Sequence, residues 1–129
     1  MILVDTSIWI ELLKKKPNIS IKQEELFLFL ICPPVVQEVL QGVKSATEFR
    51  KFEQSFLAFP MVGDPVSTET FRHAAELYRS ARRVGLTIRS PTDCLVAAIA
   101  IENHVPIWHH DRDFERICQV SDLVLHQPL

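Results

Sequence analysis

The stretch Met1-Ile2-Leu3-Val4-Asp5-Thr6-Ser7 decides which fold the rest of the chain must complete. Its three consecutive aliphatic residues predict a short strand buried on both faces, as in a parallel sheet. The strand ends at Asp5, and Thr6 or Ser7 can cap the helix that begins at Ile8. Because α/β folds bind ligands at the carboxyl ends of inner strands, Asp5 is the first candidate site residue.

The segments that follow alternate between short apolar runs and helical patterns. Further strands are expected at 29–32, 59–62, 105–108 and 123–126. Helices are expected at 8–13, 20–28, 35–43, 47–57, 67–84, 91–103 and 114–118. This alternation, with no hairpin signal, predicts the α/β class with a central, mainly parallel five-stranded sheet flanked by helices. One domain spanning residues 1–129 is expected.

Two of the expected helices carry unusual apolar surface. The 67–84 helix has a stripe at helical spacing that is expected to be core or interface; it consists of Phe71, Ala74, Ala75, Tyr78 and Ala81. The 91–103 helix is apolar nearly all round beyond Asp93. It therefore has to be covered on more than one side, by the sheet and, as one option, by a second subunit.

Composition narrows the class of protein. The chain has 129 residues, 47% hydrophobic and 23% charged, as in an ordinary globular domain. Its apolar runs are shorter than the ~20 residues of a membrane helix. Residues 1–7 carry no basic segment typical of a signal peptide, so a cytoplasmic location is expected. The net charge of −2 gives no overall attraction for nucleic acid, which would need a local basic patch. Cys32, Cys94 and Cys118 lack the spacing of a zinc site or a disulfide framework and are expected in the core.

Five acidic residues stand at element boundaries rather than on polar helix faces. Asp5 ends the first strand, Glu38 interrupts the apolar positions after the second strand, and Asp93 lies in the first turn of the apolar helix. Asp111 and Asp113 follow the fourth strand. Because parallel strands end at one edge of a sheet, these five carboxylates are expected to converge.

Each of these acids also has a structural explanation. Ser90 and Asp93 have the spacing of a capping box. Asp111 can cap the last helix, Asp113 can interact with the dipole of that helix, and Glu38 can pair with a surface cation. These separate explanations do not account for all five acids lying along one edge.

A cluster of carboxylates needs neutralisation. Two carboxylates ~4 Å apart repel by about 4 kcal/mol at an effective dielectric constant near 20. Several such pairs would rival the whole stability of a small domain, about 5–15 kcal/mol. Protons or a cation must therefore neutralise the cluster. All-oxygen ligands favour Mg²⁺ or Mn²⁺ over zinc, and such an ion suits phosphodiester hydrolysis.

Two other kinds of site share part of this pattern. His109 and His110 beside Asp111 can form a transition-metal site, but adjacent strand residues point to opposite faces, so at most one histidine can join Asp111. A receiver domain also has a strand ending in aspartate. Ser7 stands where that domain needs a second acid, and no lysine follows a late strand, so this alternative is set aside.

Four separated motifs resemble a PIN-domain protein of the VapC type, a toxin ribonuclease of a type II toxin–antitoxin pair. The resemblance covers essentially the whole chain. The motifs are Ile2-Leu3-Val4-Asp5-Thr6-Ser7, Pro34-Val35-Val36-Gln37-Glu38-Val39-Leu40-Gln41-Gly42, Ile88-Arg89-Ser90-Pro91-Thr92-Asp93-Cys94-Leu95-Val96-Ala97-Ala98 and His109-His110-Asp111-Arg112-Asp113-Phe114-Glu115-Arg116-Ile117.

The resemblance implies a three-layer α/β/α fold, a homodimer and Mg²⁺- or Mn²⁺-dependent endoribonuclease activity. It also implies inhibition by a cognate antitoxin whose C-terminal segment occupies the acidic groove. The expected catalytic residues are the acidic quartet and a frequent fifth acid: Asp5, Glu38, Asp93, Asp111 and Asp113.

The resemblance also assigns individual roles. Asp5 and Asp93 are the expected direct metal ligands, and Thr6 is the supporting hydroxyl residue beside the first acid. His109 departs from the family pattern, in which many relatives carry a threonine before the last acids.

RNA contacts would come from basic residues around the groove. The candidates are Lys14, Lys15, Lys16, Arg82, Arg89 and Arg112, of which Arg89 and Arg112 are closest in sequence to the acids. The alternative function is a non-catalytic, dimeric PIN-like module that binds a partner through its acidic groove. The sequence does not name the RNA or the number of metal ions.

Overall fold

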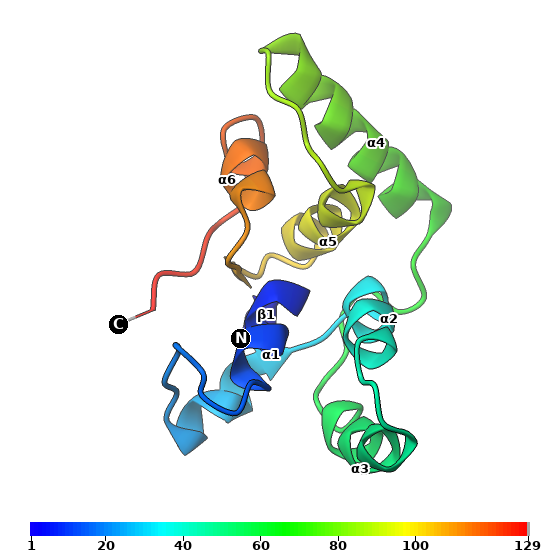
Figure 1. The fold of residues 1–129 in the computed structure, drawn as a ribbon. Helices are drawn as coiled ribbons and strands as arrows, with labels where there is room; N and C mark the ends of the chain where they lie inside the picture. Colours follow the sequence, from blue (N-terminus) through cyan, green and yellow to red (C-terminus); the bar gives the residue numbers. More distant parts are fainter. Residues whose placement is uncertain (129) are drawn as a thin grey trace.

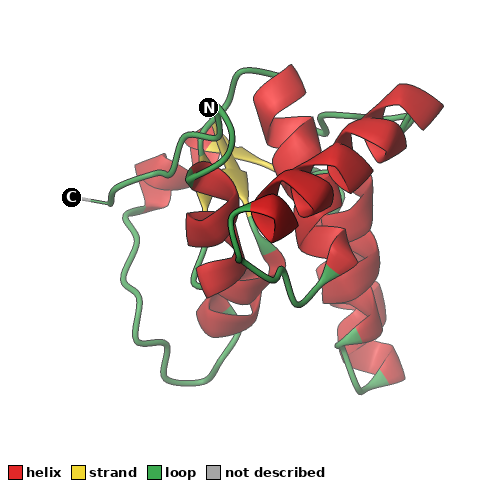
Figure 2. Cartoon of the chain, turned by 90° about the horizontal axis from the view of Figure 1, so that it is seen from above, coloured by secondary structure: helices red, strands yellow, loops and turns green. Residues whose placement is uncertain are grey.

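The computed structural model describes residues 1–128 and is built around a small parallel sheet (Figures 1 and 2). Strands β1 (Ile2–Val4), β2 (Phe29–Leu30) and β3 (Ile107–Trp108) lie in the order β2-β1-β3, with β1 in the centre. Leu3 lies opposite Leu30 on one side and Ile107 on the other. The α/β class with a parallel sheet is confirmed.

The two expected outer strands are reduced to single bridges. Met61 pairs with Ile31 at one edge of the sheet, and Leu125 pairs with Ile107 at the other, both in parallel. At the first edge, the Ile31 N–H donates to the Pro60 carbonyl and the Val62 N–H donates to the Ile31 carbonyl, but Pro60 has no N–H with which to extend the ladder. Among the described residues, three of the five expected strands are therefore regular, and the prediction of five was wrong in this respect.

Helices surround the sheet (Figure 2). The α-helices are α1 (Thr6–Leu12), α2 (Pro33–Gln41), α3 (Ala46–Phe56), α4 (Thr68–Arg83), α5 (Pro91–Glu102) and α6 (Arg112–Cys118). The helix expected at 20–28 is a 3₁₀ helix, η1 (Gln23–Leu28), which begins later than Ser20 because the Glu25 carboxylate accepts a hydrogen bond from the Lys22 N–H. None of the described helices is long and apolar enough to span a membrane.

Local sequence signals account for most helix ends. The hydroxyls of Ser45 and Ser67 accept N–H groups of the first turns of α3 and α4. Proline occupies the first positions of α2 and α5, where its missing N–H costs no hydrogen bond. Gly85, with φ of +82°, follows α4 in the left-handed conformation that side chains disfavour.

The core lies between the sheet and the helices. The side chains of β1 are buried, and Trp9 packs edge-on against Phe29, Phe56 and Phe59 while its Nε1 donates to the Val4 carbonyl at 3.1 Å. The body of α5 is buried against its neighbours, as its apolar sequence predicts. Cys32 and Cys94 are buried, and Cys118 is half-buried.

The expected stripe of α4 divides into two parts. Ala74 and Ala81, together with Leu77, face the core, whereas Phe71 and Tyr78 are 54% and 37% exposed. Helix α4 packs mainly on α5 and turns its Thr70–Ala74–Leu77–Ala81 row toward it. The remainder of the stripe forms an apolar surface beside the start of α5.

Candidate metal centre

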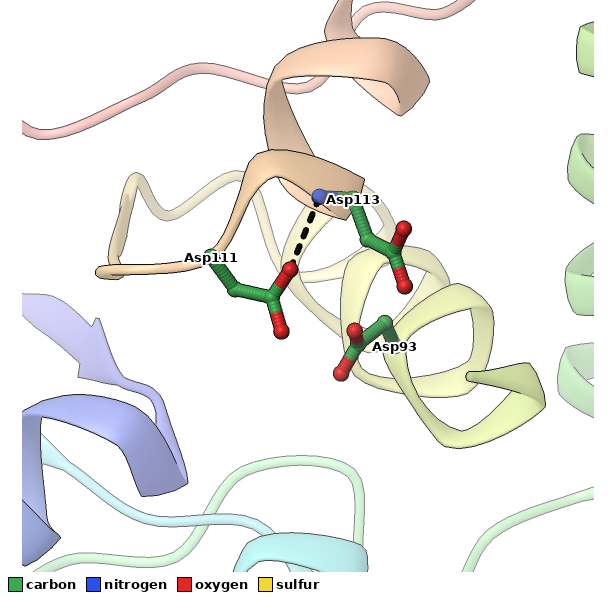
Figure 3. Close-up of side chains that lie close together, drawn as sticks. All are labelled: Asp93, Asp111 and Asp113. Atoms are coloured by element: carbon green, nitrogen blue, oxygen red, sulfur yellow. Dashed lines mark hydrogen bonds between the residues drawn. The ribbon is translucent and has the colours of Figure 1, made fainter. Parts of the chain in front are cut away.

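The structure places the five predicted acids around the carboxyl edge of the sheet. Asp5 follows β1 and Asp111 follows β3, and each stands at the N-cap of a helix. Glu38 lies on α2, beyond β2, and Asp93 and Asp113 lie in the first turns of α5 and α6. One carboxylate oxygen from each of Asp93, Asp111 and Asp113 lies within 4.8 Å of the others (Figure 3).

Asp5 is buried and only partly hydrogen-bonded. Its Oδ2 accepts the Ser7 N–H at 3.1 Å and the Ser7 hydroxyl at 2.6 Å, whereas its buried Oδ1 has no partner. Burial raises the pKa of Asp5, and the negative charge of Asp111 raises it further. The hydrogen bonds from Ser7 act to lower this pKa but do not outweigh burial. The site therefore holds a carboxylate with one unsatisfied oxygen.

Ser7 links Asp5 to the segment that carries Asp111. While the Ser7 hydroxyl donates to Asp5, the same oxygen accepts the His110 N–H at 3.0 Å. Sequence reasoning singled out Thr6 and missed this role of Ser7. A hydroxyl two residues after the N-cap aspartate was the available signal, but the contact with His110 spans 103 positions and arises only on folding.

Asp93 is the most perturbed acid of the site. Burial, and next the hydrogen bond with Asp113, raise its pKa to about 9. Its buried Oδ2 has no partner. The Ser90 side chain makes no capping bond, so the capping-box explanation of Asp93 is wrong.

Asp113 is the best-satisfied acid. Its carboxylate accepts the backbone N–H groups of Arg89 and Ser90 at 3.0–3.1 Å, and Arg116 Nη1 at 3.0 Å. Burial acts to raise its pKa, but these bonds and the one with Asp93 prevail and lower it. The Asp93–Asp113 pair thus holds a proton on Asp93 and the charge on Asp113.

Glu38 is half-buried on α2, and Thr6 Oγ1 donates to its Oε1 at 2.9 Å. Burial raises the pKa of Glu38 despite this bond, and the charges of Asp5 and Asp111 contribute further. Among the ion pairs of the described residues, none involves Glu38. The surface-pair explanation of Glu38 is therefore wrong, and Thr6 supports Glu38 through its side chain.

Asp111 does cap α6, as its structural explanation predicted. Its Oδ1 accepts the Asp113 N–H at 2.9 Å (Figure 3). His109 Nδ1 accepts the Asp111 N–H at 3.1 Å, and the His109 ring lies against Phe114. Within residues 1–128 no histidine joins the acidic group, so the histidine-metal alternative gains no support.

The donor set fits a hard divalent cation. Asp113 lies close to Asp93 and Asp111. Both oxygens of the Asp113 carboxylate, however, already accept hydrogen bonds from within the protein. The buried oxygens without partners belong to Asp5 and Asp93. A cation at this edge would give these oxygens a partner and would offset the burial and the repulsion that raise the pKa values of Asp5 and Asp93.

Comparison with known proteins identifies the family. The PIN domain model matches residues 2–120. The chain is 35% identical to Ribonuclease VapC11 of Mycobacterium tuberculosis, and the match covers 95% of this chain and 96% of the relative. This chain belongs to the PIN-domain family of VapC ribonucleases.

Relatives and a solved structure extend this result. A VapC ribonuclease of Mycobacterium bovis is also 35% identical, with the same coverage. The crystal structure of VapBC2 from Rickettsia felis, bound to a DNA fragment from its promoter, contains a chain with the same fold. The TM-score is 0.75 at 22% identity, covering 98% of both chains. The family predicted from the four motifs is confirmed.

Proposed function

We propose that this chain is the toxin of a type II toxin–antitoxin pair and an endoribonuclease that hydrolyses RNA phosphodiester bonds. The observation that carries the proposal is the pair of buried, unpartnered oxygens on Asp5 and Asp93 at an edge where three further acids gather. The family of the chain supplies the reaction class. All five acids of the family pattern are present, which argues against a binding module that has lost catalysis.

The proposed ion is Mg²⁺ or Mn²⁺, held by Asp5 and Asp93. Oxygen-only donors suit these ions. When bound, such an ion polarises a phosphoryl oxygen, lowers the pKa of a water molecule and offsets charge on the leaving oxygen. The same charge also allows a phosphodiester to approach an edge that carries five acids.

The other acids complete the site. Glu38, held by Thr6, has a raised pKa and is suited to take a proton from the attacking water. Asp111 and Asp113 position this water or a second ion. Asp113 also fixes the start of α5 through the N–H groups of Arg89 and Ser90, so it orients Asp93.

The proposed partners are a cognate antitoxin and a second copy of the chain. A basic segment of the antitoxin would fit the acidic edge. The second copy would cover an apolar groove of about 570 Å³ between α4 and the start of α5, where Phe71, Tyr78 and Leu95 lie. Phe71→Glu should shift a dimer toward monomer in light scattering.

The proposal also takes residues 1–129 as a single domain and places the protein in the cytoplasm.

An RNA cleavage assay tests the proposed function. Wild type with Mg²⁺ or Mn²⁺ should cut RNA internally, whereas Asp5→Asn and Asp93→Asn should lose activity while keeping the fold. EDTA should abolish the wild-type activity. Equal cleavage by wild type and both variants would reject the proposed site. A wild type that binds partners but never cleaves RNA would favour the non-catalytic alternative.

A further inference from the structure

The stretch between Glu76 and Asp93 carries unbalanced positive charge. It contains four arginines, at positions 79, 82, 83 and 89, and no acidic residue. The whole chain has a net charge of −2, so this stretch opposes the overall charge. Local concentrations of like charge attract ligands of the opposite sign.

In the described part of the chain, the arginines near the end of α4 differ from Arg72 in forming no ion pair. Arg72, earlier on α4, pairs with Glu69 at 3.0 Å and Glu76 at 3.4 Å. Arg79, Arg82 and Arg83 are exposed and form no ion pair with any residue in the described part of the chain. These three arginines, here called the α4 patch, line a hollow of about 350 Å³ together with Tyr78. Arg79 also borders the groove assigned to the second copy.

Helix stability does not account for the whole patch. Arg82 and Arg83 lie in the last turn of α4, where cations favour the helix dipole. Arg79 lies a turn earlier, and like charges at i, i+3 and i+4 repel by about 0.2–0.5 kcal/mol per pair. An anionic ligand with several charges would relieve this repulsion, and guanidinium groups bind phosphates in a bidentate manner.

The patch is connected to the acidic edge by the returning chain. After α4, residues 84–90 run back toward the start of α5 (Figure 1). Arg89 ends this path, and its N–H binds Asp113. Arg89 lies six positions after Arg83, so their Cα atoms lie at most about 22 Å apart. Single-stranded nucleic acid sites commonly span about 4–16 nucleotides, enough to cover this separation.

We propose that the α4 patch binds the phosphate backbone of the RNA substrate outside the cleaved bond. This inference rests on the proposed function. A partner peptide that enters the acidic edge would be basic and would avoid the arginines. RNA is a polyanion, so its phosphates can bind the arginines directly. At the acidic edge, its phosphates can bind the cation that the carboxylates hold.

The experiment compares two variants with equal loss of charge. R79Q/R82Q/R83Q removes the patch. K44Q/R50Q/K51Q removes three exposed cations on and just before α3, which lies far from the end of α4 (Figure 1). Binding of a labelled 20-nucleotide single-stranded RNA is measured by anisotropy in EDTA at several salt concentrations. Melting temperature and light scattering verify the fold and the oligomeric state of both variants.

The patch variant should bind this RNA at least about tenfold more weakly than wild type at low salt. Its slope of log affinity against log salt should fall by about 2, since each phosphate contact contributes about 0.7. The control variant should keep most of the wild-type slope. With Mg²⁺ or Mn²⁺, the patch variant should cleave a tetranucleotide as fast as wild type does. It should cleave the 20-nucleotide RNA with a higher KM than wild type.

Each of the following outcomes would overturn the inference. Unchanged RNA binding by the patch variant, with normal wild-type cleavage, would reject the patch and keep the proposed function. A wild type that neither binds nor cleaves RNA would reject the proposed function and the inference with it. Weaker binding of a poly-glutamate peptide, with unchanged RNA binding, would assign the arginines to an acidic protein partner. If the triple variant fails to fold, the single variants R79Q and R72Q replace it, and equal RNA affinity of these two would contradict the proposal.

Discussion

Helix α5 carries a carboxylate near each end, and the two are held in opposite ways. Asp93, in the first turn, is buried with an unpartnered oxygen, and its pKa is raised to about 9. Glu102, the last residue, is exposed and accepts the Thr70 hydroxyl at 2.7 Å. His73 Nδ1 lies 2.8 Å from the same carboxylate, and these contacts outweigh burial and lower the pKa of Glu102.

The helix dipole alone predicts the opposite pair of pKa shifts, with a lowered pKa at the first turn and a raised pKa at the last. A negative charge should be favoured at the first turn and disfavoured at the last, by about 0.3–1 kcal/mol. One pKa unit corresponds to about 1.36 kcal/mol, so a rise from 3.8 to about 9 exceeds any dipole effect. Burial and the neighbouring acids therefore decide the state of Asp93. Glu102 stabilises the fold, whereas a charge on Asp93 requires a cation.

The largest expected contrast between the two ends is catalytic. Asp93→Asn should lower RNA cleavage by about 10³-fold, because loss of the ion removes several kcal/mol of transition-state stabilisation and about 1.36 kcal/mol is tenfold. Glu102→Gln should stay within about twofold of wild type, since Glu102 lies outside the site. Initial rates at saturating Mn²⁺ measure both. A large loss in Glu102→Gln would remove the distinction between the two ends.

The second largest effect is expected in how the stability of wild type and of Asp93→Asn depends on pH. In EDTA, the folded-state pKa of Asp93, about 9, lies above its ordinary value of 3.8, so the folded state holds a proton that the unfolded state has released. The resulting stability is complete below about pH 4 and is lost as the pH rises toward 9. Asp93→Asn stays neutral, so it should melt at a higher temperature than wild type at about pH 8.

Circular dichroism melts from about pH 5 to pH 8 measure this effect. The difference between Asp93→Asn and wild type should grow with pH. Glu102→Gln is the matched control, because it removes an acid from the same helix without removing the raised pKa. If Asp93→Asn and wild type kept a constant difference in melting temperature over this range, the protonated state of Asp93 would be rejected.

A smaller effect is expected at the other end of the helix. Glu102→Gln should cost about 0.5–1 kcal/mol at neutral pH, because an amide oxygen accepts the hydrogen bonds from Thr70 and His73 less strongly than an exposed carboxylate. The pKa of Glu102 is lowered, so its contribution is present above its ordinary value and is lost as the pH falls. Urea melts should therefore give a difference at pH 7 that fades in acid; a difference that grows in acid would contradict this assignment.

The smallest effect is expected for the hydroxyl that holds Glu102. Thr70→Val keeps the shape of a buried side chain on α4 and removes the donor to Glu102, at a cost of about 0.5 kcal/mol. Urea unfolding measures the change, with Thr68→Val as an exposed control on the same helix. A loss of several kcal/mol would mean that the contact between α4 and α5 depends on this bond far more than the comparison implies.

Much of this arrangement could be predicted from local sequence. Asp5 at the end of an aliphatic strand and Asp93 in an otherwise apolar helix both conflict with their surroundings, and such conflicts indicate function. The helix boundaries followed from Ser67, Pro91 and Gly85, whose effects on the backbone are local. For the same reason the order of elements and the parallel sheet were predictable.

The rest depends on contacts that form only in the folded chain. The outer strands shrink to bridges at Met61 and Leu125 because pairing at a sheet edge depends on neighbouring geometry. Periodicity alone did not tell which half of the α4 stripe faces α5. Asp113 was predicted as a catalytic acid, which stays a prediction, and its bonds to Arg89 and Arg116 were invisible in the sequence.

Calorimetric titration of Mn²⁺ into the metal-free protein tests most directly whether the first end of α5 is a cation site. Wild type and Glu102→Gln should bind the ion with equal affinity, and Asp93→Asn should bind it at least about tenfold more weakly. Equal Mn²⁺ affinity in wild type and Asp93→Asn would contradict the account, because the unpartnered oxygen of Asp93 would then have no part in binding the ion.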